Sequence, residues 1–228
     1  MTKILLTGGS GVLGSEIRKI SAHTIIAPTS EECNILSDSK VFCAFIKEKP
    51  DIVIHAAAYT NVKKAELNPC ECINANVIGT FNILNACRTF NTKLVYISTD
   101  YVFDGIIGNY KTTDAINPLS NYAKTKAAAE LIVRTYKNTL VIRTSFYPKE
   151  FPYEYACTDL WTTKDYVDII APKVLQASLS DERGIMHIGS ARRSVYEIAK
   201  SRNKDVMPIS HQELNFPIPK DTSLIQNA

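Results

Sequence analysis

Tyr122 and Lys126 lie four residues apart in the segment Tyr122-Ala123-Lys124-Thr125-Lys126. On a helix, this spacing places a phenol and an ammonium on one face. A free tyrosine has a pKa of about 10, and a nearby cation favours its phenolate. The pair therefore fits a tyrosine that gives a proton to a carbonyl oxygen, tuned by a lysine. The alternative is a solvated pair on a helix surface, since the pattern is common.

Thr99 could act on the same atom, because it follows residues 92–98, which are expected to form a strand. Reactive groups gather beyond the carboxyl ends of parallel strands, and Tyr122 starts the helix that follows this strand. Thr99 would bind the substrate oxygen, Tyr122 would pass the proton, and Lys126 would also hold ribose hydroxyls. Alone, Thr99 would be read as a strand-end cap.

A glycine-rich stretch, Thr7-Gly8-Gly9-Ser10-Gly11-Val12-Leu13-Gly14, lies between the first expected strand and the first expected helix. In this context one glycine makes a tight turn, a second admits a pyrophosphate, and a third lets helix and strand pack closely. The positive end of the helix dipole favours the same ligand. A dinucleotide is therefore expected, and with the three side chains above it indicates hydride transfer.

The end of the second expected strand selects the nicotinamide cofactor, because an acid there holds a ribose 2′-hydroxyl and repels a 2′-phosphate. Ala27-Pro28-Thr29-Ser30 contains no acid. The hydroxyls of Thr29 and Ser30 could hold a phosphate, although no arginine is next to them in the sequence. This favours NADPH, with NADH tolerated.

Strand-like and helix-like segments alternate from the start of the chain, which is typical of parallel strands joined by crossover helices. The expected strands are 3–7, 23–27, 51–57, 92–98 and 139–144, and the expected helices are 12–20, 39–47, 70–90 and 118–136. The helix over 70–90 is expected to bury the face formed by Ile73, Val77, Phe81, Leu84 and Cys87.

The rhythm breaks after Ser145 into an aromatic and proline-rich stretch, residues 146–153, which is expected to be irregular. We expect two parts, a dinucleotide-binding part over 1–145 and a small substrate-binding part over 146–228. In the second part, helices are expected near 164–179 and 194–201, with a short strand at 185–188. The fold class is α/β, a Rossmann-type doubly wound parallel sheet.

Composition excludes several classes of protein. The formal charge is +3 and the basic residues are scattered, so no nucleic-acid partner is expected. The apolar runs are too short to cross a bilayer and no signal peptide is evident, which favours the cytoplasm. The six cysteines are expected to be reduced, and no metal site is expected, since Cys70 and Cys72 lack a second ligand pair.

The spacing G-x-x-G-x-x-G resembles the short-chain dehydrogenase/reductase superfamily. Longer strings resemble one of its extended families, the dTDP-4-dehydrorhamnose reductases, over residues 1–145. The strings are VIHAAAYT at 53–60, AE at 65–66, NVIGT at 76–80, STDYVFDG at 98–105 and NPLSNY at 117–122. The resemblance implies NADPH-dependent reduction of the 4-keto group of a nucleotide-linked 6-deoxyhexose, as in L-rhamnose-type biosynthesis.

The resemblance also implies where the ligands lie. The substrate would meet Thr99, Asp100, Tyr101 and Phe146. Related 4,6-dehydratases carry Asp-Glu where this chain has Asp100-Tyr101, and without that second carboxylate we expect reduction rather than dehydration. The cofactor would contact Gly8, Ser10, Gly11, Val12, Leu13, Gly14, Asn34, Ile35, Ala56, Ala57, Ala58, Tyr59, Ser98, Tyr122 and Lys126.

Three departures from the family's pattern keep alternatives open. Lys63 stands where the family has an acid, Phe146 stands where a tryptophan is typical, and the segment between Ser145 and Asp165 is shortened. A non-catalytic nucleotide-binding regulatory subunit, like that of methionine adenosyltransferase, is one alternative. A combined 3,5-epimerase and 4-reductase is another. Formation of a homodimer is left open.

Overall fold

Six parallel strands form the central sheet of the computed structural model, which describes residues 2–214 and 218–226. Adjacent strands pair in parallel throughout. In spatial order they are β10 (Gly184–His187), β5 (Thr139–Arg143), β4 (Lys93–Ser98), β3 (Ile52–His55), β1 (Lys3–Thr7) and β2 (Thr24–Ile26). The expected Rossmann-type sheet is confirmed.

The direction of the strand order reverses next to β1. The chain passes from β1 to β2 on one side and then returns to place β3 on the other side. In open parallel sheets, ligands bind beyond the carboxyl ends of the strands at such a reversal. The glycine-rich stretch follows β1, so it lies at this point.

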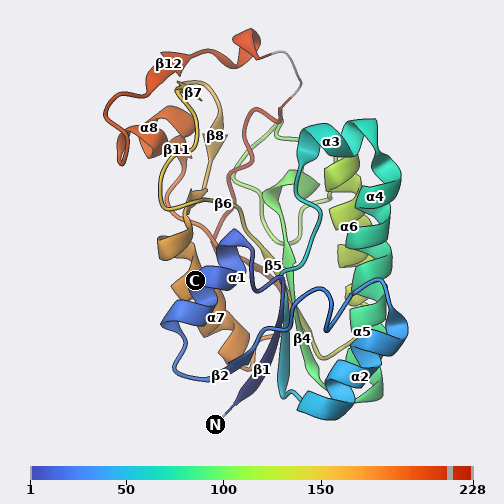
Figure 1. Ribbon diagram of the computed structural model, residues 1–228. Coiled ribbons are helices and arrows are strands. Elements are labelled where there is room, and N and C mark those ends of the chain that lie inside the picture. Colours follow the sequence, from blue (N-terminus) through green and yellow to red (C-terminus); the bar gives the residue numbers. More distant parts are fainter. Residues whose placement is uncertain (1, 215–217, 227–228) are drawn as a thin grey trace.

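Helices cover both faces of the sheet, as Figure 1 shows, because side chains along each strand alternate between the faces. Ile4 and Leu6 pack with α1 (Val12–Ile20) and α7 (Val167–Leu179). Leu5, between them, packs on the opposite face. That face is covered by α2 (Asp38–Glu48), α5 (Gly79–Thr89) and α6 (Asn121–Val133).

The helix expected over 70–90 is interrupted. It consists of α4 (Pro69–Ile73), a π-helical turn η1 (Asn74–Ile78) and α5. A π turn inserts one residue and rotates the helical turns before it relative to those after it. The predicted buried face is therefore wrong in part, since Ile73 is 43% and Phe81 51% exposed. The short helix α3 (Val62–Leu67), just before α4, was not predicted.

The segment after Ser145 builds a small cap at the carboxyl ends of the strands, next to the helix α8 (Val195–Lys200) in Figure 1. Its two-residue strand β6 lies within the stretch expected to be irregular. The expected helix at 164 begins only at Val167, after β9. The pairs are β6 (Phe146–Tyr147) with β9 (Asp165–Tyr166), β8 (Trp161–Thr162) with β11 (Arg193–Ser194), and β7 (Tyr155–Cys157) with β12 (Met207–Ile209).

The cap has its own apolar cluster, but the chain beyond residue 145 does not stay in it. α7 and β10 return to the main sheet and its core. Two short 3₁₀ turns, η2 (Asp100–Val102) and η3 (His211–Glu213), complete the elements. Among the described residues, no helix is long and apolar enough to cross a bilayer. The cap cluster comprises Phe151, Ala156, Tyr166, Ile198, Ala199 and Val206.

Candidate functional site

The glycine-rich stretch, called the glycine cradle below, packs so closely against neighbouring backbone that side chains would not fit. Gly8 has φ +74°, and a Cβ on it would lie 2.6 Å from the backbone nitrogen of Ala57. A Cβ on Gly14 would collide with the Gly8 carbonyl oxygen. Gly11 is the N-cap of α1 and offers no side-chain hydrogen bond to the first turn. The first backbone N–H groups of α1 are therefore open to an anion such as a pyrophosphate.

The segment from Ala56 to Tyr59, expected to line the cofactor, is held by Asn76. The backbone N–H of Tyr59 donates to the Asn76 Oδ1 at 2.8 Å, and Asn76 Nδ2 donates to the Tyr59 carbonyl at 3.2 Å and to Thr125 Oγ1 at 2.9 Å. Asn76 lies in the π turn and is buried. The family strings include Asn76, but sequence reasoning did not single out this positioning residue.

His55 fixes the end of β1, directly before the glycine cradle. Its Nδ1 lies 2.7 Å from Thr7 Oγ1 and its Nε2 lies 3.0 Å from Thr80 Oγ1, so one ring joins β1, β3 and α5. Burial, reinforced by the charge of Lys126, lowers the pKa of His55 to about 3. The ring is therefore neutral near pH 7, and its two hydrogen bonds hold these elements together.

Asn34 and Ile35, expected beside the adenine, follow β2 and Pro28. The Ile35 side chain packs directly on Gly79, since a Cβ on Gly79 would lie 2.6 Å from Ile35 Cδ1. The Asn82 amide donates to the Ile35 carbonyl oxygen at 2.8 Å. Asn34 is exposed, and its Oδ1 accepts from the Leu36 backbone N–H at 2.9 Å.

Thr99 and Tyr122 are brought together, as the sequence predicts. The Thr99 hydroxyl hydrogen-bonds the Tyr122 phenol, and it also accepts from the Tyr101 backbone N–H at 3.2 Å. Burial raises the pKa of Tyr122 to about 12, while the Thr99 hydrogen bond and the charge of Lys164 act in the opposite direction. Tyr122 is therefore a protonated phenol near pH 7, a group that can donate a proton.

The side chains of Lys126 and Ser98 hydrogen-bond to other groups of this chain. The Lys126 Nζ donates to the Ile97 carbonyl oxygen at 2.7 Å and lies 4.2 Å from the centroid of the Tyr96 ring. Burial lowers its pKa to about 7. The Ser98 hydroxyl donates to Glu130 Oε2 at 2.7 Å. The roles of both residues toward a cofactor stay predictions.

Lys164 is a cation at the site that sequence reasoning missed. Its Nζ lies 4.8 Å from the centroid of the Tyr101 ring and 5.5 Å from that of Tyr147. Burial opposes its charge, but the phenols of Tyr101 and Tyr147 and the Asp100 carboxylate outweigh burial and raise the pKa of Lys164. In the sequence, Lys164 lies outside the motifs that predict the site, so nothing there marks it as a site residue.

The buried Asp100 carboxylate accepts hydrogen bonds from several hydroxyl groups. It accepts from Ser145, from Thr222 Oγ1 at 2.8 Å and from Thr162 Oγ1 at 3.4 Å. These donors come from the end of β5, from the cap and from the last described segment. Asp100 thus ties the cap to the sheet directly beside Thr99.

The remaining residues expected at the substrate lie around Asp100. Tyr101 and Phe146 are half-buried, and Phe146 begins β6 and packs against the core under α1 and α7. Lys63, which replaces an acid of the family's pattern, is exposed on α3. The structure thus groups Thr99, Tyr101 and Tyr122 with Lys164.

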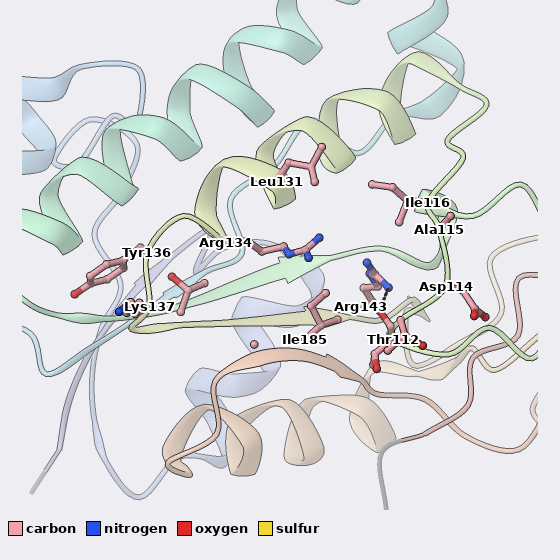
Figure 2. Close-up of a pocket in the computed structure, with 13 residues that line it drawn as sticks. Thr112, Asp114, Ala115, Ile116, Leu131, Arg134, Tyr136, Lys137, Arg143 and Ile185 are labelled. Atoms are coloured by element: carbon pink, nitrogen blue, oxygen red, sulfur yellow. Dashed lines mark hydrogen bonds between the residues drawn. The ribbon is translucent and has the colours of Figure 1, made fainter.

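A groove of about 680 Å³ lies elsewhere, beside β5, β10 and the second half of α6 (Figure 2). Its lining includes Arg134, Lys137 and the loop residues 112–116. Arg143 forms part of its wall and is ion-paired with Glu130 at 2.6 Å. None of the predicted site residues lines this groove.

Comparison with known proteins decides the family. A family model described as "RmlD substrate binding domain" matches residues 1–174. The chain belongs to this family. A curated relative, the dTDP-4-dehydrorhamnose reductase of Aggregatibacter actinomycetemcomitans, is 34% identical over 182 residues, which cover 76% of this chain. The resemblance stated from the sequence motifs is confirmed.

Solved structures of the RmlD family agree over the whole fold. The dTDP-4-dehydrorhamnose reductase of Bacillus anthracis, determined in complex with NADP, has a TM-score of 0.91 and 26% identity, covering 100% of this chain and 92% of that one. Its counterpart from Clostridium acetobutylicum has a TM-score of 0.90 and 28% identity, covering 99% and 90%. In sequence, however, this chain spans only 62% of the Aggregatibacter relative.

Proposed function

We propose that this protein is a reductase of the cytoplasm that uses NADPH to reduce the 4-keto group of a nucleotide-linked 6-deoxy-4-ketohexose, in L-rhamnose-type nucleotide-sugar biosynthesis. One observation carries the proposal. The Thr99–Tyr122 hydrogen bond lies at the same sheet edge as the glycine cradle after β1. Relatives described as dTDP-4-dehydrorhamnose reductases, one of them in complex with NADP, support the substrate and the cofactor.

The chain's residues fit a dinucleotide. The open N-terminus of α1 suits a pyrophosphate, and Ile35 offers an apolar surface for the adenine. Lys126 stays our candidate to hold ribose hydroxyls. When bound, NADPH supplies the hydride for the carbonyl carbon.

Tyr122 supplies the proton. Its pKa of about 12 keeps the phenol protonated near pH 7, and an alkoxide is basic enough to take this proton. Thr99 orients the phenol and can donate to the substrate oxygen. Lys164 is the cation that stabilises the phenolate after transfer, a role that the sequence assigned to Lys126.

Tyr101 favours simple reduction. Dehydration requires a base that removes a proton from the sugar ring, and the neighbouring acid, Asp100, is buried under its hydroxyl donors. Tyr101 hydrogen-bonds Lys164 and has no carboxylate to offer. The side chains next to Thr99 therefore suit proton donation to O4 better than proton removal from carbon.

Tyr122→Phe tests the proposal. In an assay with NADPH and a dTDP-4-keto-6-deoxyhexose, followed at the nicotinamide absorbance band, turnover should fall at least ~100-fold, the scale of general acid catalysis. NADPH affinity, measured by fluorescence titration, should be retained. Tyr153→Phe is the matched control, since Tyr153 is 62% exposed in the cap, and it should keep full turnover.

Unchanged turnover in Tyr122→Phe would contradict the role of Tyr122. Tight NADPH binding by the wild type, without oxidation by any keto-sugar and with a co-purifying protein, would favour the regulatory subunit instead. Incorporation of solvent deuterium at C3 or C5 of the product would show that the protein also epimerises. Each outcome separates one of the alternatives that the sequence left open.

A further inference from the structure

The residues that follow β2 offer a 2′-phosphate the hydroxyls of Thr29 and Ser30 but place a carboxylate beside them. The Thr29 hydroxyl accepts from the Glu32 backbone N–H at 3.3 Å, and the Thr29 N–H donates to Glu32 Oε2 at 2.8 Å. An accepting hydroxyl keeps its own proton, which Thr29 can donate to a phosphate. The turn also brings the Glu32 carboxylate to this strand end, so a 2′-phosphate here needs a cation from another element.

Arg18, on α1, reaches this strand end. It lies one turn after Gly14, and helical side chains lean back toward the N-terminus of their helix. A Cβ on Gly9 would lie 3.6 Å from Arg18 Cδ and 2.6 Å from Ala27 Cβ. The Arg18 side chain thus runs along the glycine cradle toward Ala27, the residue that follows β2. The sequence, which shows no arginine near Thr29, hides this approach.

The charge of Arg18 is not used by the described part of the protein. The nearest acid on its own helix, Glu16, pairs with Lys149 at 2.8 Å and with Lys19 at 3.6 Å. No hydrogen bond or ion pair links Arg18 to another described residue, and the residue is exposed. An exposed guanidinium presents a fork of donors that matches two phosphate oxygens.

We propose that Arg18 binds the 2′-phosphate of NADPH and thereby selects NADPH over NADH. This inference rests on the proposed function, because it places the adenosine ribose between the glycine cradle and the end of β2. Gly9 is part of the arrangement, since a Cβ there would collide with Ala27 and lie in contact with Arg18. The selection comes from the Arg18 cation on α1, which offsets the repulsion between the 2′-phosphate and the Glu32 carboxylate next to Thr29.

Arg18→Gln tests the inference by binding alone. In calorimetric titrations of the whole protein, the wild type should bind NADPH roughly 10- to 100-fold more tightly than NADH, the scale of hydrogen bonds to a charged group. Arg18→Gln should remove this preference by weakening NADPH only. Lys19→Gln, the adjacent cation on the same helix, is the matched control and should keep the preference. Arg18→Lys should restore part of it.

The outcomes separate this inference from the proposed function. An NADPH preference that survives Arg18→Gln, with the variant folded by circular dichroism, would overturn the role of Arg18. Equal affinity of the wild type for both cofactors would overturn it as well. A changed preference without turnover on any keto-sugar would leave Arg18 in place and refute the reductase. Wild-type protein that binds neither cofactor would refute both.

Discussion

The cofactor half and the substrate half of the proposed site differ in what they are made of. Around the glycine cradle, the surface offered to a ligand is backbone, the first N–H groups of α1, and Gly8 and Gly14 let the surrounding backbone pack closely. Around Asp100, the working surface is a set of side chains collected from distant segments. Thr222, for example, is 122 positions away from Asp100 in the sequence.

This difference determines which changes each half tolerates. A surface made of backbone fails when an atom is added to it, whereas the loss of a nearby hydroxyl matters little. A surface made of convergent side chains fails when its common acceptor is lost, because several buried donors then lose their partner at once. Substitutions that add or remove atoms should therefore separate the two halves.

Gly14→Val should have the largest effect on the cofactor half. The added side chain would meet the Gly8 carbonyl oxygen and push α1 away from the cradle. Overpacking of this kind costs about 3 kcal/mol of unfolding free energy, and displacement of the α1 N-terminus should lower the NADPH affinity, measured by fluorescence titration, roughly 100-fold. Gly184→Ala is the control: no atom lies within 4 Å of its Cβ position, and the strain from its φ of +85° stays at the start of β10, so it should leave the affinity unchanged.

Asp100→Ala should have the largest effect on the substrate half. It removes the acceptor that the hydroxyls of Ser145, Thr162 and Thr222 share, and we expect a loss of about 3 kcal/mol in the free energy of unfolding. Turnover should fall with it, while the folded variant should bind NADPH normally. Thr222→Val removes one donor and should cost only about 1 kcal/mol. Equal losses of turnover and NADPH affinity would contradict the division into two halves.

The cofactor half was predictable because its signals are local. Gly8, Gly11 and Gly14 lie within one short stretch. The succession of strands and helices along the chain follows from the alternation of apolar runs. The proximity of Tyr122 to Thr99 was also predictable, because Thr99 follows one strand and Tyr122 starts the helix that comes after that strand. The sheet, its parallel strands and the position of the cradle all follow from such short-range information.

The substrate half and the details of the cofactor half were not predictable in this way. The π turn at Asn74–Ile78 changes the buried face of a helix without any proline or glycine inside the turn to announce it. Lys164 is one cation among many in the sequence, and only folding of the cap brings it to Tyr101. Arg18 lies along Gly9, which itself packs against Ala27. Each depends on contacts between elements, which spacing does not encode.

The two buried lysines should show opposite effects on stability. In the cofactor half, burial lowers the pKa of Lys126 to about 7, below its usual 10.5, so the unfolded chain holds this proton more tightly. Stability from this group should therefore rise between about pH 7 and 10. In the substrate half, the partners of Lys164 raise its pKa, so its contribution is fully present below its unfolded pKa of 10.5.

Urea unfolding of Lys126→Met and Lys164→Met between about pH 6 and 9 checks this contrast. Lys164→Met should lose about 2 kcal/mol at every pH in this range, the scale of a desolvated cation–π contact. Lys126→Met should lose the pH-dependent rise instead. Lys93, whose pKa burial lowers to about 8, contributes equally to all three proteins. Identical pH profiles for both variants and the wild type would contradict the assignment.

Ser98→Ala should have the smallest effect, although Ser98 is among the residues predicted to contact the cofactor. Its hydroxyl already donates to Glu130, and Glu130 keeps its ion pair with Arg143 when this donor is removed. We expect a loss of about 1 kcal/mol in unfolding free energy and no measurable change in NADPH affinity. A tenfold loss of affinity would mean that a side chain, and not only backbone, holds the cofactor at this strand end. The cofactor half would then depend on side chains as the substrate half does, and the contrast between the two halves would fail.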